Sequence, residues 1–354
     1  MDQDELMPET APATASFGHP FRASITPVRD GAPRPLWSVM IPTYNCARYL
    51  RGTLESVLAQ DPGPDHMQIE VVDDSSQDDP AAVVAEVGRD RVGFFRQPVN
   101  VGHTANFATC LQRSRGRLVH LLHGDDAVRD GFYQKMQKAF ECQPEIGAAF
   151  CRHIFMDEMG HWHSISPLEQ GHSGLLANSL EHLATEQRIM TPSIVVRRDV
   201  YEQVGGFDRR LVCTEDWEMW IRIAAQHPIW YEVEPLALYR MHADSNTGRH
   251  LRSGQDARYT RMAIEIFKAY LPPARADEIT RRARNTYAAS TLHTARSMLS
   301  RRDHTAMLRL IRETLLFSHS PAVVQKTFLL LLRAALMSAK DVVSAASELV
   351  EAWS

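Results

Sequence analysis

Between Trp37 and Leu122 the chain alternates short apolar segments with segments of helical periodicity. We predict strands at residues 37–41, 69–72, 92–96 and 118–122, and helices at residues 46–60, 80–88 and 104–113. Strands separated by helices of this length pair in parallel, because the crossover helix returns the chain to the same edge of the sheet. The sequence therefore predicts an α/β fold with a doubly wound, mostly parallel sheet.

The first of these strands runs directly into Pro42-Thr43-Tyr44-Asn45. Proline has no backbone N–H, so we expect strand pairing to end there and a loop to follow. Loops at the carboxyl ends of strands are where open α/β sheets bind ligands. Tyr44 would offer a flat aromatic face to a base, and Asn45 a polar tip. A buried strand followed by an ordinary turn is the alternative for this segment taken alone.

Pairs of carboxylates follow two further strands, at Asp73-Asp74 and at Asp125-Asp126. Asp74 could accept hydrogen bonds from a base or a sugar. Asp125 and Asp126 could hold a hard divalent cation, because Mg²⁺ and Mn²⁺ prefer oxygen ligands. Turn chemistry alone also explains either pair, since aspartate caps helices and tolerates turn geometry. Two pairs at two strand ends of one sheet are more informative than either pair alone.

A third acidic segment, Thr214-Glu215-Asp216, precedes an apolar helix face. Asp216 could act as a general base if partial burial raised its pKa. The structural alternative is that Thr214 caps the helix and that the acids favour its dipole. The start of this helix could serve both roles.

Composition sets the limits for partners and compartment. The 354 residues suffice for one large domain or two ordinary ones, and the formal net charge of −4 gives no general attraction to nucleic acid. The five cysteines are scattered without a CxxC pair, which argues against a zinc site or a disulfide framework and suits a reducing cytoplasm. The acidic first ten residues do not form a signal peptide, and no apolar run is long enough to span a membrane.

Three regions are predicted from composition and periodicity. Residues 1–35, rich in Pro, Ala, Thr and Ser, are expected to be a disordered or loosely held arm, and residues 36–250 to form the α/β domain. Residues 255–354 are expected to be helical. Between Arg240 and Glu313 there are 15 Lys and Arg against 7 Asp and Glu. This basic helical region could contact anionic lipid peripherally, or could instead be a packing or homodimerisation module.

Six motifs, in one order and spacing, resemble the family-2 glycosyltransferases of the GT-A fold. The resemblance covers roughly Trp37 to Thr247. The motifs are VMIPTYN, VVDDSSQDD, Asn100-Val101-Gly102 with Asn106, HGDD, the segment Thr191–Ala224 with its Glu215-Asp216, and Leu238-Tyr239-Arg240-Met241-His242.

The resemblance implies a role for individual positions. Asp216 matches the general base. Asp126 matches the metal ligand, and His242 a residue that touches the metal in some members. Donor-binding positions are matched by Pro42, Thr43, Tyr44, Asn45, Asp74, Gly102, Asn106, Asp125 and Arg240. His123 departs from the commoner pattern, because many members have an aspartate there. The implied cofactor is a divalent cation, Mn²⁺ or Mg²⁺, and the implied donor a nucleotide-sugar, with UDP favoured by the match of Asp74.

The resulting hypothesis is a metal-dependent, inverting glycosyltransferase that moves a sugar from a nucleotide diphosphate to a hydroxyl of a glycan or a lipid-linked saccharide. Surface polysaccharide biosynthesis is the setting that the family implies, in the cytoplasm or at the inner face of the membrane. A nucleotidyltransferase would be expected to carry a Gly-rich phosphate loop where this chain has PTYN. A catalytically silent nucleotide-sugar binding or scaffold protein is the alternative from another class, and the acids Asp126 and Asp216 argue against it.

Overall fold

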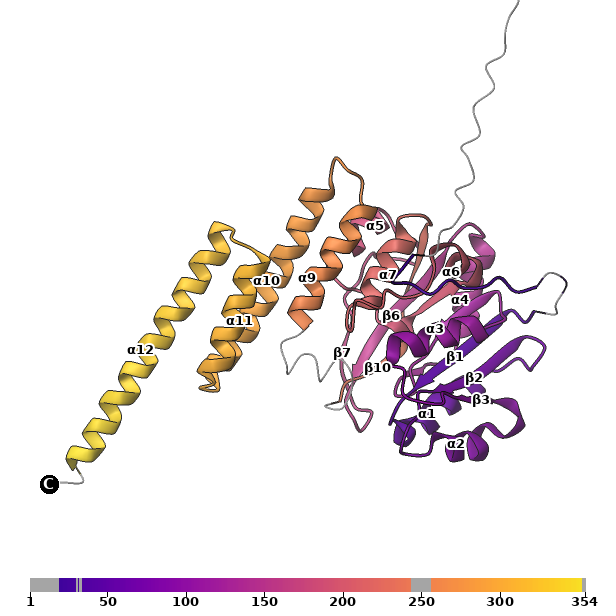
Figure 1. The fold of residues 1–354 in the computed structure, drawn as a ribbon, viewed down its shortest axis with the longest axis horizontal. Coiled ribbons are helices and arrows are strands. Elements are labelled where there is room, and N and C mark those ends of the chain that lie inside the picture. The colour runs from indigo at the N-terminus through magenta and orange to yellow at the C-terminus, as the bar shows by residue number, and fades with distance from the viewer. Residues whose placement is uncertain (1–18, 30, 32–33, 243–255, 352–354) are drawn as a thin grey trace, which may run out of the picture.

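The computed structural model describes residues 19–29, 31, 34–242 and 256–351, and of residues 338–351 only the backbone. Among these residues, ten strands form one mixed sheet with the order β3-β2-β1-β4-β9-β6-β10-β5, to which β7 and β8 add at β6 and β10. Helices cover both faces of the sheet, and the C-terminal helices extend to one side (Figure 1). The predicted α/β sheet with a C-terminal helical region is confirmed.

The first half of the sheet is parallel, as its alternating sequence predicts. Its strands are β1 (Trp37–Thr43), β2 (Met67–Asp73), β3 (Gly93–Arg96) and β4 (Leu118–Leu121). They are separated by α1 (Ala47–Leu58), by α2 (Pro80–Val83) with a π-helical turn after it, and by α3 (His103–Arg113). Val39 lies opposite Ile69 of β2 and His120 of β4, so β1 is buried between two parallel neighbours.

Pro42 ends the pairing of β1 on one side only. Pairing with β4 stops at Met40, whereas pairing with β2 continues through Thr43. The Pro42 carbonyl accepts a hydrogen bond from the backbone N–H of Gly124, 3.1 Å away, in the loop after β4. Because N–H and C=O of one strand residue point the same way, the missing N–H of Pro42 faces the side where β4 has ended. The expectation that all pairing ends at Pro42 is therefore wrong for β2.

The second half of the sheet contains an antiparallel strand. Here β9 (Ile194–Arg197) runs antiparallel to both β4 and β6 (Ala148–Met156), and β6 runs parallel to β10 (Ile229–Arg240). The shorter elements are β5 (Ala127–Val128), α4 (Phe132–Cys142), β7 (Trp162–Ile165), β8 (Gly174–Leu175), α5 (Ser179–Leu183), α6 (Arg198–Val204) and α7 (Glu215–Ala224).

Residues 19–29 of the N-terminal arm are held against the body of the protein. Ile25 is 3% exposed and belongs to the main apolar core. Arg22 pairs with Glu218 of α7 at 3.1 Å, and its backbone bridges to Asp208. A loosely held arm is therefore wrong for these residues, because buried apolar contact and ion pairs hold them. Residues 1–18 lie outside the described residues.

The C-terminal region consists of α9 (Asp256–Phe267), α10 (Ala276–Ser300), α11 (His304–Phe317) and α12 (Pro321–Glu351). Helix α9 and the first half of α10 share one apolar core with the sheet, in which Phe267 and Ile279 are fully buried. The second half of α10 forms a separate cluster with α11 and α12. Within the described residues, no helix has the length and apolar character needed to cross a bilayer.

Candidate active site

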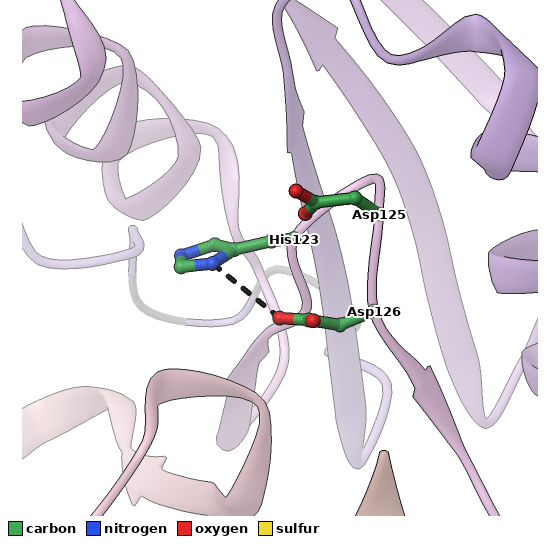
Figure 2. Close-up of side chains that lie close together, drawn as sticks. All are labelled: His123, Asp125 and Asp126. Atoms are coloured by element: carbon green, nitrogen blue, oxygen red, sulfur yellow. Dashed lines mark ion pairs between the residues drawn. The ribbon is translucent and has the colours of Figure 1, made fainter. Parts of the chain in front are cut away.

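Three potential metal ligands converge where β4 gives way to β5. Each of His123, Asp125 and Asp126 offers one ligand atom, and these three atoms lie within 4.8 Å of one another. Figure 2 shows the three side chains projecting to the same side of the loop. Helix α1 holds the loop that carries them, because the Thr53 hydroxyl donates to the carbonyls of Gly124 and Asp126 at 3.1 and 2.7 Å. The predicted acidic pair thus stands at the carboxyl edge of the parallel strands.

Asp126 is a buried carboxylate that is only half satisfied. It is 2% exposed, and its Oδ1 accepts the backbone N–H of Arg240 at 2.8 Å. Its Oδ2 makes no hydrogen bond and lies 3.6 Å from Nδ1 of His123, whose own buried Nε2 is also without a hydrogen-bond partner. Burial and the neighbouring charge of Asp125 raise the pKa of Asp126 well above its usual value. A buried oxygen without a donor fits a cation ligand, since a cation would satisfy it.

Asp125 and Arg240 are tied to one another and to β10. The Asp125 carboxylate lies 2.9 Å from Nε2 of His242. Burial pushes the pKa of Asp125 upward, but the hydrogen bond from His242 and nearby histidine charges hold it below its usual value. The guanidinium of Arg240 donates to the carbonyls of Asp125, Asp157 and Glu158 at 2.8–3.2 Å and lies over the Tyr49 ring. Its role toward a diphosphate stays a prediction, because these contacts engage it in bracing the acidic loop.

Asp74 fastens the loop before α3. Its two carboxylate oxygens accept the backbone N–H groups of Val101 and Gly102 at 2.7 and 3.0 Å. Burial raises the pKa of Asp74 despite these hydrogen bonds. Each oxygen retains a second lone pair, so a contact to a base stays compatible with this geometry. Its neighbour Asp73 is purely structural in its contacts, pairing with Arg96 at 2.9 Å.

The segment Thr43-Tyr44-Asn45 leaves β1 and reaches the surface. Tyr44 is 41% exposed, as a face for a base must be. Asn45 has a left-handed backbone with φ of 51°, and its side-chain oxygen accepts the N–H of Gln77 at 2.8 Å. Thr43 is buried, and its hydroxyl donates to the Ile41 carbonyl. Tyr44 and Asn45 are therefore the exposed side chains of this segment, and the side-chain oxygen of Asn45 is already engaged with Gln77.

Gly102 and Asn106 shape the start of α3. Gly102 has φ of 85°, a backbone conformation that favours glycine. Asn106 is 2% exposed, donates to the Val72 carbonyl at 2.8 Å and accepts from Gln97 at 3.2 Å. Asn106 thus links α3 to β2 and to the segment after β3, and its predicted contact with a sugar donor stays a prediction.

Asp216 lies at the start of α7 within a set of hydrogen-bond donors. Nε2 of Gln187 lies 2.9 and 2.8 Å from its two carboxylate oxygens, and the N–H of Trp217 donates to Oδ1 at 2.8 Å. Burial is the larger cause and the negative charge of Glu215 the smaller cause that together raise the pKa of Asp216 to about 7. A carboxylate with a pKa near neutrality is suited to general-base chemistry.

His103 joins this region to α3 and was not found by sequence reasoning. Its Nε2 lies 3.1 Å from a carboxylate oxygen of Glu215. Burial lowers the pKa of His103, but the charges of Glu215, Asp216 and Asp74 outweigh it and raise the pKa overall. The pKa of His103 therefore depends both on Asp74 and on the candidate base Asp216. Only its place directly after Gly102 could have drawn attention to it.

Thr214 does not cap α7 as expected. Its backbone is left-handed, with φ of 69°, and its hydroxyl donates to the Cys213 carbonyl and makes no capping hydrogen bond with a helix N–H. Within the described residues, the group of side chains that could hold a metal includes none of the four histidines between residues 155 and 188. His161 and His163 lie near Asp157, and His182 pairs with Glu169.

Comparison with known proteins agrees with this geometry. The profile described as Glycosyl transferase family 2 matches residues 38–205. The chain is 31% identical over 227 residues to the uncharacterized protein MT1568 of Mycobacterium tuberculosis, covering 61% of this chain and 70% of that protein. It is 25% identical over 230 residues to the uncharacterized glycosyltransferase RP339 of Rickettsia prowazekii, covering 61% and 67% of the two chains.

Solved structures share the fold at low sequence identity. Residues 1–349 of S. aureus TarS superpose with a TM-score of 0.58 at 16% identity, over 79% of this chain and 80% of that one. The complex of the same protein with UDP-GlcNAc gives 0.58 at 17% identity, over 78% and 81%. The fold and the family match define a glycosyltransferase. The chain belongs to glycosyl transferase family 2.

Proposed function

We propose that the protein is a metal-dependent, inverting glycosyltransferase, with a divalent cation at Asp126 and Asp216 as general base. The observation that carries this proposal is the half-satisfied buried carboxylate of Asp126 beside His123 and Asp125. A structural acid at this depth would be expected to have partners for both oxygens. The carboxylate oxygens and the imidazole suit Mn²⁺ or Mg²⁺, with Mn²⁺ the better match for a nitrogen ligand.

The leaving group of the reaction is a nucleoside diphosphate that gains negative charge as the glycosidic bond breaks. A cation held by Asp126 and neighbouring residues would stabilise that charge as it develops. Arg240 fixes the ligands, because its backbone N–H orients Asp126 and its guanidinium binds the Asp125 carbonyl. His242 orients Asp125 in the same way. Arg240, the last residue of β10, and His242, two residues after it, thereby set the geometry of the acidic loop.

The acceptor hydroxyl needs a base that is ionised near neutral pH. Asp216 meets this requirement because burial and Glu215 raise its pKa to about 7. Taking the acceptor proton as the acceptor oxygen attacks C1 opposite the leaving diphosphate would invert the anomeric centre in one step. Donors from Gln187 and Trp217 fix the Asp216 carboxylate in one orientation. No covalent sugar–enzyme intermediate is required.

A uridine diphosphate sugar is the donor we propose. Tyr44 offers an exposed ring directly after β1, and Asp74, directly after the neighbouring strand β2, retains acceptor capacity. The similar TarS structure contains UDP-GlcNAc, which supports a UDP-sugar as the first donor to test. The proposed acceptor is a hydroxyl of a glycan or lipid-linked saccharide in cytoplasmic assembly of a surface polysaccharide.

The outer helix α12 supports a peripheral membrane contact. Its exposed apolar side chains share one face, to which Lys326 and Arg333 lie adjacent, and they are Val324, Phe328, Leu329, Leu331, Leu332 and Leu336. Residues 301–337 contain six Lys and Arg against two Asp and Glu. An apolar face bordered by basic residues suits an anionic lipid surface better than a second copy with the same charge.

This contact is tested by sedimentation with vesicles. The protein should sediment with phosphatidylglycerol vesicles and not with phosphatidylcholine vesicles, and the double variant F328S/L332S should stay in solution. If the wild type forms a concentration-dependent dimer and the same double variant is monomeric, the face serves homodimerisation instead.

The proposed function is tested by donor binding and turnover. A thermal-shift screen of nucleoside diphosphates and nucleotide-sugars, each with Mn²⁺, Mg²⁺ or EDTA, should give a metal-dependent shift with a uridine nucleotide. Asp216→Asn should retain that shift and lose sugar transfer. Normal transfer by Asp216→Asn would remove the base assignment, and the absence of any nucleotide shift would favour a scaffold protein.

A further inference from the structure

The segment between α5 and β9 carries the side chain that holds the candidate base. Nε2 of Gln187 contacts both oxygens of Asp216, at 2.9 and 2.8 Å. Gln187 itself lies outside helix or strand, so no secondary-structure hydrogen bond fixes its backbone. Its position therefore depends on the tertiary contacts that this segment makes.

One such contact comes from the C-terminal helices. The backbone N–H of Gln187 donates to the hydroxyl of Tyr287 on α10, at 3.0 Å. The two residues are 100 positions apart in the sequence. Two hydrogen bonds thus connect the C-terminal region to the candidate base. Tyr287 accepts one from the backbone of Gln187, and the side chain of Gln187 donates the other to Asp216.

Aromatic packing fixes Tyr287 in this position. Its ring lies 5.2 Å from the ring of Trp217, the residue that follows Asp216, and stacks on Phe317 of α11 at 5.9 Å. Trp217 also packs edge-on against Phe267 of α9, at 4.9 Å, and its indole N–H donates to the Leu183 carbonyl at 2.8 Å. Tyr287 is therefore held between the start of α7 and the helices behind it.

We propose that the C-terminal helices position the general base: Tyr287 holds the backbone of Gln187, and Gln187 fixes the carboxylate of Asp216. Tyr287 and Gln187 are positioning residues, and this proposal rests on the proposed role of Asp216. The helical region is then part of the catalytic architecture, beyond any contact that it makes with a membrane or a second copy.

Loss of this support has two consequences. A donor to a carboxylate favours its ionised form, so removal of the Gln187 contact should raise the pKa of Asp216. Asp216 would also occupy more rotamers, which lowers the turnover number more than it changes donor binding. The charged groups that act on this carboxylate include Glu215 on α7 and His103 on α3, and Glu186 and Arg188, beside Gln187, act on Tyr287. None of these is altered by substitution of Tyr287.

The direct test is a pH titration of Asp216 that does not require turnover. The protein is labelled with ¹³C at the aspartate side-chain carboxyl, and the Asp216 signal is assigned by its loss in Asp216→Asn. Tyr287→Phe removes one hydroxyl and keeps the ring, and Gln187→Met removes the donor from a segment at the surface. Tyr270→Phe is the matched control, because Tyr270 also joins the helical region to α7, donating to Glu218 at 2.7 Å.

We expect the titration midpoint of Asp216 to rise by about 0.5–1 pH unit in Tyr287→Phe and in Gln187→Met, and to stay unchanged in Tyr270→Phe. With an identified donor, the turnover number at pH 6 should fall about three- to tenfold in both variants, while KM for the donor stays within about twofold. An unmoved midpoint in Gln187→Met would overturn the proposal, as would an equal rise in Tyr270→Phe. A raised midpoint in a protein that turns over no nucleotide-sugar would support the positioning and reject the proposed function.

Discussion

Replacing Asp126 by asparagine should stabilise the metal-free protein and abolish its response to metal. The wild-type side chain is a buried carboxylate whose Oδ1 accepts the N–H of Arg240 and whose Oδ2 makes no hydrogen bond. Asparagine keeps the first acceptor and removes the buried charge. The substitution thus separates the cost of an unpaired charge from the benefit of a bound cation.

The magnitude follows from the burial of this group. Leaving a buried polar group unsatisfied costs about 1–3 kcal/mol, and more when the group is charged, so we take about 2 kcal/mol for Asp126. In a protein of 354 residues, that corresponds to a rise in Tm of about 3 °C in EDTA. The raised pKa of Asp126 sets the pH dependence. The wild-type penalty is fully present above the folded pKa and disappears below the unfolded value of about 3.9, where both states are protonated.

The assay is a thermal melt of wild type and Asp126→Asn in EDTA and with Mn²⁺ plus UDP. A ligand at 100 times its dissociation constant adds about 2.7 kcal/mol to the wild type alone, so the order of stability should reverse between the two conditions. Asp73→Asn is the control, because Asp73 is equally buried but is paired with Arg96. It should destabilise the protein in both conditions. If Asp126→Asn also destabilises it in EDTA, Asp126 is a satisfied structural acid and the metal argument fails.

Three further outcomes are expected. Sugar transfer should increase with pH through about 7, because Asp216 must be ionised to accept a proton, and a pH-independent rate between 5 and 9 would contradict this. Glu215→Gln should move the midpoint of that profile to lower pH, since the charge of Glu215 raises the pKa of Asp216; a midpoint that stays or rises would speak against it. Phe267→Ala should lower the free energy of unfolding by about 3–5 kcal/mol in denaturant, and a loss below about 1 kcal/mol would show that α9 does not share the core.

The local sequence pattern was sufficient to predict the strands that precede Asp74 and Asp126. The strands predicted at residues 37–41, 69–72 and 118–122 are short apolar runs, and their alternation with helices predicts the parallel pairing that is observed. Acids after parallel strands must meet at one edge, so Asp74 and Asp126 could be placed without coordinates. A strand at residues 193–197 was predicted, but the antiparallel direction of β9 was not, because a four-residue apolar run does not encode its direction.

Contacts between distant segments could not be predicted. His103 and Glu215 are 112 positions apart, and neither carries a local signal for the other. Gln187 lies in a segment without periodicity, yet it contacts Asp216 through both oxygens. Thr214 has the residue type of a cap, but its left-handed backbone turns the hydroxyl away from the helix. Tertiary packing decided each of these cases over local preference.

The measurement that tests the central claim most directly is an NMR time course of UDP-sugars with the protein and Mn²⁺, in wild type and in Asp216→Asn. Proton spectra report both the consumption of donor and the anomeric configuration of the product. The account predicts metal-dependent turnover with inversion in the wild type, and donor binding without turnover in Asp216→Asn. Turnover that survives in Asp216→Asn, retention of configuration, or no metal-dependent turnover of any nucleotide-sugar would contradict it.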